Sequence, residues 1–291
     1  MQTRLYDPRR RTQRMRRTAS LAVPGADFLM REAVADCIDR LRVVTRTFPK
    51  GVALLGRTDG LAEALADLHS VENVLRIEEE GATTGTVPVD AMLGESGTLP
   101  LEPGSIDLVV VPWSLHYADD LPGMMIQIAR ALRPDGLFMA TLPGGDTLQE
   151  LRASLLQAES ELRGGAALRV DAMTDIRDAG ALLQRAGFAL PVIDSDSFTV
   201  RYDTMFDLIR DLRGFGATSV RIDDASPPLT RAIATRAAAI YAENFSDDDG
   251  RIRATFQMIS LSGWSPHDSQ QKPLKPGSAT IELRDVLEKK R

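Results

Sequence analysis

Residues 52–60 read Val52-Ala53-Leu54-Leu55-Gly56-Arg57-Thr58-Asp59-Gly60, an apolar run that ends in a loop with two glycines. A short, wholly apolar run is typical of a strand buried on both faces of a parallel sheet. Pro49-Lys50-Gly51 is expected to break the chain before it, and Leu61 to His69 is expected to be helical. The turn at Gly56 and Gly60 lets a nucleotide-like cofactor approach the backbone. An ordinary strand-to-helix turn is the alternative.

The same alternation of apolar runs and helical patterns continues along the chain. We expect helices where apolar residues recur every three or four positions, and the strongest further strand at residues 106–111, which Pro112 ends. Strands alternating with helices predict a parallel sheet covered on both faces. The other expected strands are residues 74–77, 86–91 (weakly marked), 137–142 and 188–193, and the expected helices are 26–44, 121–132, 146–163 and 174–187.

Local signals mark several boundaries of these elements. Asp120 is expected to cap a helix with Pro122 in its first turn, and Asp146 with Gln149 forms a capping-box pattern. Residues 133–136 are expected to form a turn. The distal part, residues 199–245, is mainly helical in pattern, followed by an alternating strand at 253–261 near a sheet edge. In it Thr204 and Ser226 are expected caps, Pro227 an expected first helical residue, and 281–287 a possible short element in the polar tail.

Composition narrows the class of protein. The chain has 291 residues, a net charge of -6 and one cysteine, Cys37. We therefore expect no general affinity for nucleic acid, no disulfide framework and a cytoplasmic location. The sequence contains no run of about 20 apolar residues, the length that a membrane span needs, so no transmembrane segment is expected. The three histidines do not form a ligand spacing, so no metal site is expected.

Seven arginines stand in the first 17 residues, against the single acid Asp7. Three interpretations are open: a solvated arm or helix, an organelle-targeting peptide, and a docking arm for an acidic partner or an anionic membrane surface. The third would give peripheral membrane contact without a transmembrane segment.

Candidate site residues follow the expected strands, where ligands bind in open α/β sheets. Glu78 and Glu79 end the second strand, where a carboxylate can accept both hydroxyls of a ribose; a solvated acidic turn is the alternative. Glu95 is a candidate acceptor for an adenine amino group. After the strongest strand come Pro112, Trp113, His116 and Tyr117, which suit substrate orientation or proton transfer, or a packed loop. None is a certain catalytic residue.

The order of these motifs resembles class I methyltransferases that depend on S-adenosylmethionine (SAM), in the methyltransferase type 11 and biotin-synthesis carboxyl-methyltransferase-like group. More narrowly, it resembles the group of arginine-hydroxylating assembly factors of respiratory complex I and their bacterial relatives. The resemblance covers nearly the whole chain. Its narrower motifs are Ser114-Leu115-His116-Tyr117-Ala118-Asp119-Asp120-Leu121-Pro122, Gly144-Gly145-Asp146-Thr147-Leu148 and Pro276-Gly277-Ser278-Ala279-Thr280.

This resemblance implies a Rossmann-like sheet of seven strands, mostly parallel with the last strand antiparallel, and a helical lid at residues 199–250. It divides the chain into an Arg-rich arm (1–24), a methyltransferase-fold domain (25–265) and a loop and tail (266–291). It implies SAM as the cofactor. The implied contacts are Gly56, Asp59, Gly60, Glu78 or Glu79, Glu95, Pro112 and Trp113, with Trp113, His116 and Tyr117 orienting the substrate.

One position departs from the family pattern. An acid usually stands two residues before the first glycine, where it pairs with the ammonium of SAM, but here the residue is Leu54. Losing such a partner costs about 1.5–3 kcal/mol, or roughly ten- to a hundredfold in affinity. Weak binding, no binding, and substitution by Asp59 remain open.

Three functions therefore follow from the sequence. The first is an enzyme that modifies a protein side chain with SAM, by methylation or hydroxylation, on an arginine of a complex I iron–sulfur subunit. The second is a non-catalytic assembly or chaperone factor with a degenerate SAM site. The third is a methyltransferase for a small molecule or an acyl-carrier carboxyl group, with Arg201, Arg210 and Arg213 as a basic patch. The mitochondrial matrix is the alternative location.

Overall fold

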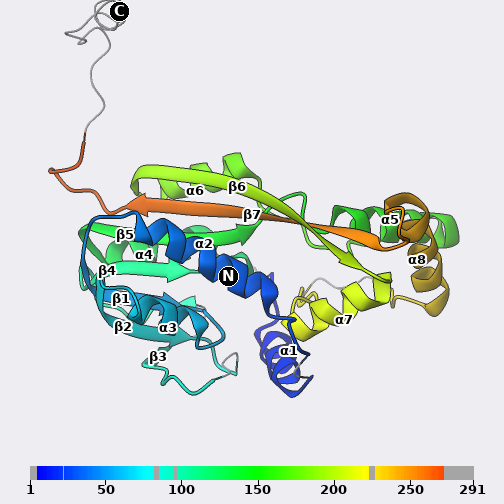
Figure 1. Ribbon diagram of the computed structural model, residues 1–291, viewed down its shortest axis with the longest axis horizontal. Helices are drawn as coiled ribbons and strands as arrows, with labels where there is room; N and C mark the ends of the chain where they lie inside the picture. The colour runs from blue at the N-terminus through cyan, green and yellow to red at the C-terminus, as the bar shows by residue number, and fades with distance from the viewer. Residues whose placement is uncertain (1–4, 22, 82–84, 95–96, 223–226, 272–291) are drawn as a thin grey trace, which may run out of the picture.

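Over the residues that it describes, 5–21, 23–81, 85–94, 97–222 and 227–271, the computed structural model holds one seven-stranded sheet (Figure 1). The strand order is β3-β2-β1-β4-β5-β7-β6, and β7 runs antiparallel to both of its neighbours. This confirms the expected Rossmann-like sheet with an antiparallel last strand. The strands are β1 (Phe48–Leu54), β2 (Val71–Glu78), β3 (Ala91–Met92), β4 (Ile106–Val111), β5 (Leu132–Pro143), β6 (Ala189–Tyr202) and β7 (Ile252–Trp264).

Helices cover both faces of the sheet because the central strands are apolar on both sides. On one face α2 (Phe28–Arg42) and α3 (Gly60–Ala66) bury their apolar stripes in one core cluster. On the other face α4 (Leu121–Ala131) and α6 (Ile176–Arg185) pack in a second cluster. Cys37 lies in the first cluster as a fully buried apolar residue, where burial raises the pKa of its thiol to about 12.

The long strands β6 and β7 extend past the end of β5 and carry a second helical group (Figure 1). In it α5 (Gln149–Arg163) packs against α8 (Arg231–Phe245), and α7 (Met205–Phe215) contacts α8. The N-terminal helix α1 (Pro8–Leu21) lies against α7 rather than in solvent. The described part of the Arg-rich segment therefore forms a helix packed against the folded body and not a free arm, although several of its arginines are exposed.

Several expected boundaries were wrong. Pro49 and Gly51 lie inside β1 instead of breaking the chain, since a proline near the start of a strand costs little pairing. Residues 133–136 form a bulge within β5, not a free turn. The strand expected at 86–91 is only β3. Before Ala91, side chains replace part of the ladder: the Asp90 carboxylate accepts from the Arg76 N–H, and the Asp59 carboxylate accepts from the Thr86 N–H.

Caps and the lid differ in detail. Asp120 caps α4 as expected, accepting from the Gly123 N–H at 2.8 Å, and Thr204 caps α7. The capping box at Asp146 is wrong, because Gln257 on β7 holds this loop and α5 begins later, at Gln149. Three further differences are that Asp175 and not Thr174 caps α6, that residues 199–202 complete β6, and that α8 begins at Arg231, with Thr230 as its cap, and not at Pro227. Ser226 and residues 281–287 lie outside the described residues.

Candidate functional site

The candidate site lies where β1, β2 and β4 end, because the carboxyl ends of neighbouring parallel strands meet at one edge of the sheet. Three non-glycine residues at this edge have a positive φ: Leu55 (56°), Arg57 (62°) and Trp113 (44°). Such backbone conformations are costly for bulky residues and concentrate at functional sites. The strained backbone therefore lies at the same sheet edge where the sequence predicted ligand binding.

The glycine loop after β1 makes its contacts with other residues of this chain. A side chain added at Gly56 would meet the Cβ of Leu61 at 3.1 Å, so this glycine serves the packing of loop against helix α3. Gly60 begins α3, and Asp59 precedes it without capping the helix. The Asp59 carboxylate instead accepts from the Thr86 N–H and pairs with the Arg76 guanidinium. Hydrogen bonding from the Thr86 backbone, despite partial burial, lowers the pKa of Asp59.

Glu78 ends β2 as expected, but its carboxylate is fully buried. It accepts from the backbone N–H of Arg57 at 3.0 and 3.2 Å and from Arg76 Nε at 3.1 Å. Burial raises the pKa of Glu78, against the opposing effects of Arg76 and the Arg57 N–H. The two donors to this carboxylate, the Arg57 N–H and Arg76 Nε, are therefore groups of the protein and not ribose hydroxyls.

Leu54, where the family has an acid, is a core residue. It is fully buried at the end of β1 and pairs with Ile77 of β2. The leucine side chain belongs to an apolar core cluster and supplies no charge at this position. Asp59, the alternative partner for an ammonium, is already engaged by Arg76.

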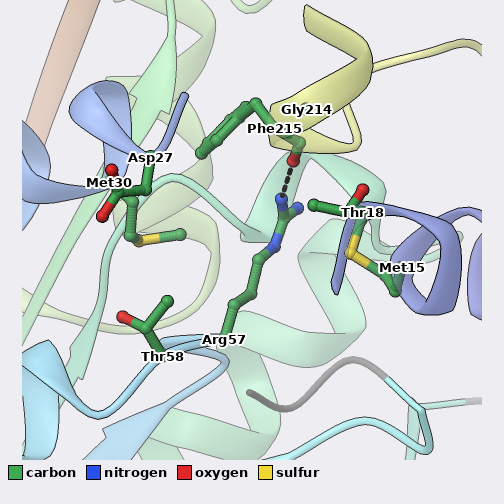
Figure 2. A pocket seen from close by; sticks show the side chains of 8 residues that line it. All are labelled: Met15, Thr18, Asp27, Met30, Arg57, Thr58, Gly214 and Phe215. Carbon is green, nitrogen blue, oxygen red and sulfur yellow. Dashed lines mark hydrogen bonds between the residues drawn. The ribbon is translucent and has the colours of Figure 1, made fainter. Parts of the chain in front are cut away.

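The side chain of Arg57 extends from the loop after β1 toward the last turn of α7 (Figure 2). Its guanidinium carbon lies 5.3 Å from the ring centre of Tyr117 and 5.3 Å from that of Phe215. Its Nη1 donates to the Phe215 carbonyl at 3.4 Å. The cavity beside it measures about 60 Å³ and is lined by Met15, Thr18, Asp27, Met30, Arg57, Thr58, Gly214 and Phe215.

The expected residues in the loop after β4 differ in their surroundings. Pro112 and Trp113 are buried, and the Trp113 side chain belongs to the first core cluster. The Trp113 backbone N–H donates to Thr141 on β5. His116 and Tyr117 are instead only partly buried, with ring centres 4.0 Å apart. Burial first, then Arg57 and Arg11, lowers the pKa of His116 well below its usual value. Among the described residues its Nδ1 has no hydrogen-bond partner.

Helix α1 also contributes residues to the site. The sequence did not predict this contribution. Arg11 forms an ion pair with Glu79 at 2.9 Å, and its guanidinium carbon lies 4.7 Å from the ring centre of Tyr117. The Tyr6 ring meets the same tyrosine edge-on at 6.1 Å. Arg11, Tyr6, Met15 and Phe215 were therefore missed as site residues, because only the three-dimensional fold brings them to the strand ends.

These residues do not fit SAM in this conformation. The cavity beside Arg57 is several times smaller than the pockets of about 300–1,000 Å³ that hold ligands, and it is not lined by the implied contacts Gly56, Glu78 or Trp113. The expected ribose acid Glu78 is bound by Arg57 and Arg76, Glu79 is bound by Arg11, and Leu54 supplies no charge. Glu95 lies outside the described residues. Within those residues there is no cluster of metal ligands, and no helix is long and apolar enough to cross a membrane.

Comparison with known proteins places this geometry in a family. A family model described as a methyltransferase domain matches residues 60–140. A Danio rerio protein, "Arginine-hydroxylase NDUFAF5, mitochondrial", is 36% identical over 264 residues, which cover 89% of this chain and 82% of the relative. A "Malonyl-[acyl-carrier protein] O-methyltransferase" of Xylella fastidiosa (strain M23) is 31% identical over 179 residues, 62% of this chain and 58% of that protein.

A solved structure of a proposed methyltransferase from Bacillus halodurans is similar with a TM-score of 0.54 and 13% identity, over 81% of this chain and all of that chain. This level of identity shows the fold alone. The fold and the site edge define the chain as a protein of the class I methyltransferase fold. The extent and identity of the match then assign it more narrowly: the chain belongs to the family of the arginine hydroxylase NDUFAF5.

Proposed function

We propose that this chain is a partner-binding assembly factor of the NDUFAF5 family that works without SAM. The observation that carries the proposal is the position of Arg57, whose guanidinium lies in the crevice between Tyr117 and Phe215 while its N–H binds Glu78. A cofactor in this crevice would have to displace a buried ion network that includes Arg76 and Asp59. Such networks are costly to break by removing one partner.

The partner in this proposal is a protein that presents an arginine, since the relatives are arginine hydroxylases. The resemblance of the sequence to complex I assembly factors suggests an iron–sulfur subunit of that complex. The cytoplasm of a bacterium is the proposed location, with the mitochondrial matrix as the alternative that the relatives' name supports. The Arg-rich helix α1 leaves Arg9, Arg16 and Arg17 exposed for an acidic partner or an anionic membrane surface.

A second candidate is modification of that arginine with SAM as the cofactor. Gly56, Gly60 and Glu78 stand at the strand ends where the resemblance implies cofactor contacts, and this favours the enzyme. In this case Arg57 and α1 would have to leave the crevice first. When bound, SAM would supply the reactive group. The reaction would require that Arg57 and α1 first make room for the cofactor.

Carboxyl methylation of an acyl-carrier substrate receives less support. Two of the three arginines that the sequence offered as a basic patch form ion pairs within the chain: Arg201 with Asp247, at 2.7 Å, and Arg210 with Asp207. An anionic carrier protein would meet charges that are already compensated.

Affinity capture from cells that contain complex I tests the proposal. The tagged chain should retain an iron–sulfur subunit to the same extent with and without added SAM. Mass spectrometry should find the arginines of the captured subunit neither methylated nor hydroxylated in a way that depends on this chain. Capture of no complex I subunit would overturn the partner-binding role. Modification that disappears when the gene is deleted would favour the second candidate.

A further inference from the structure

The guanidinium of Arg57 occupies a site made by two aromatic rings from distant parts of the chain. Tyr117 follows β4, and Phe215 is the last residue of α7. Both ring centres lie 5.3 Å from the guanidinium carbon, within the range at which a planar cation is attracted to an aromatic face. The same tyrosine attracts a second guanidinium, that of Arg11, at 4.7 Å.

The end of helix α7 adds an electrostatic component to this site. The Phe215 carbonyl accepts from Arg57 Nη1, and carbonyls at a helix C-terminus carry partial negative charge. Beside the guanidinium, Met15 and Met30 give the small cavity apolar walls (Figure 2). Asp27 also lines this cavity, but its carboxylate pairs with Arg31 at 3.4 Å. Aromatic faces, a helix-end carbonyl and apolar walls together suit a flat cation on an apolar stem, which describes an arginine side chain.

The loop that carries Arg57 does not require an arginine. Its φ is 62°, a conformation that glycine adopts most easily. The turn therefore holds a long charged residue where a glycine would suit the backbone better. The strained position is consistent with a role for the side chain itself.

We propose that Tyr117, Phe215 and the terminal carbonyl of α7 form a guanidinium-binding site that Arg57 occupies in the free protein and an arginine of a bound protein occupies in the complex. Only the source of the incoming arginine rests on the proposed function; the site itself rests on the geometry. Release of Arg57 exchanges one guanidinium for another between the same rings, so no charge is left buried without a partner.

Titration calorimetry with N-acetyl-L-argininamide tests the site on the full chain. The variant Arg57→Gly removes the internal competitor and suits the positive φ, so it should bind this probe at least tenfold more tightly than the wild type. An attached competitor acts at an effective concentration in the millimolar range, which is the basis of this difference. N-acetyl-L-lysinamide, a compact cation without the planar fork, should show at most a third of the gain.

The double variant Arg57→Gly, Phe215→Ala should lose the gain, because one aromatic wall is missing. Equal affinity of the wild type and a folded Arg57→Gly variant for the arginine probe would overturn the proposal, as would an unchanged gain in the double variant. If Arg57→Gly does not fold, Arg57→Met keeps an apolar stem without the cation and should still gain at least threefold. Probe binding without capture of a complex I subunit would leave this site standing and contradict only the proposed function.

Discussion

The carboxylate of Glu78 accepts the backbone N–H of Arg57 at 3.0 and 3.2 Å, so the acid at the end of β2 braces the loop at the end of β1. Arg76 Nε holds the same carboxylate at 3.1 Å, and its Nη1 pairs with Asp59. A residue expected to receive a ribose therefore serves as a structural link between two strand ends.

Arg76→Met should destabilise the protein strongly. Arg76 and Glu78 have almost no exposed side-chain surface, and removing one partner of a buried pair leaves an uncompensated charge. We expect a loss of about 3 kcal/mol in the free energy of unfolding, measured by urea denaturation. The control variant Arg133→Met breaks the ion pair between Arg133 and Asp107, in which the arginine side chain is 42% exposed. It should cost about 1 kcal/mol or less. Equal losses in the two variants would refute the structural role of the network.

Leu54→Asp should not restore a cofactor site. The side chain is fully buried among apolar neighbours, so the substitution creates a cavity and places a carboxylate in it. Leu54→Ala should cost about 2–5 kcal/mol, and Leu54→Asp more, since the charge adds to the lost packing. Val43→Asp, at a side chain that is 80% exposed, should change stability by about 0.5 kcal/mol or less. A stable Leu54→Asp protein that binds SAM would contradict the core assignment.

His116 should make the protein less stable as the pH falls. Burial and the nearby Arg57 and Arg11 keep its pKa well below 6.5 in the folded state, so between that pKa and about 6.5 only the unfolded chain binds the proton. The free energy of unfolding should then decrease on acidification below pH 6.5, by up to about 1.4 kcal/mol per pH unit. His116→Phe should remove this slope, whereas His69→Phe, at an exposed position, should retain it. Parallel slopes for the wild type and His116→Phe would show that this residue does not contribute.

Arg11→Ala should release helix α1 from the site. The substitution removes the ion pair with Glu79 and the contact with the Tyr117 ring, both made by a side chain that is 11% exposed. We expect a loss of about 2 kcal/mol in stability and faster hydrogen exchange in α1. Arg17→Ala, at an exposed position on the same helix, is the control and should change neither quantity. Unchanged exchange in Arg11→Ala would mean that other contacts hold the helix.

The central part of the fold could be predicted because its signals are local. Residues 106–111 are all apolar except Asp107, and the expected strand matches β4 residue for residue. Asp120 caps its helix through a contact three residues away. By contrast, β6 continues to Tyr202 although its pattern is polar, since it is an edge strand whose pairing with β7 comes from a distant segment.

The candidate site shows the same division. The sequence placed Gly56, Glu78 and Tyr117 at neighbouring strand ends, because the order of parallel strands fixes where their ends meet. It could not predict that Arg57 turns toward Phe215, since this contact spans 158 residues. Nor could the arginine-rich start identify Arg11 as the residue that meets Glu79, because only the docking of α1 on α7 selects it.

Isothermal titration of the wild-type chain with SAM tests the central claim most directly. Arg57, whose backbone N–H is bound by Glu78, leaves a cavity of only about 60 Å³ beside its side chain, so millimolar SAM should give no binding heat. The variant Arg57→Gly, Thr58→Gly, which rebuilds a small loop but leaves Leu54 in place, should bind weakly at best. Saturable binding of SAM to the wild type with a Kd in the micromolar range would contradict the account.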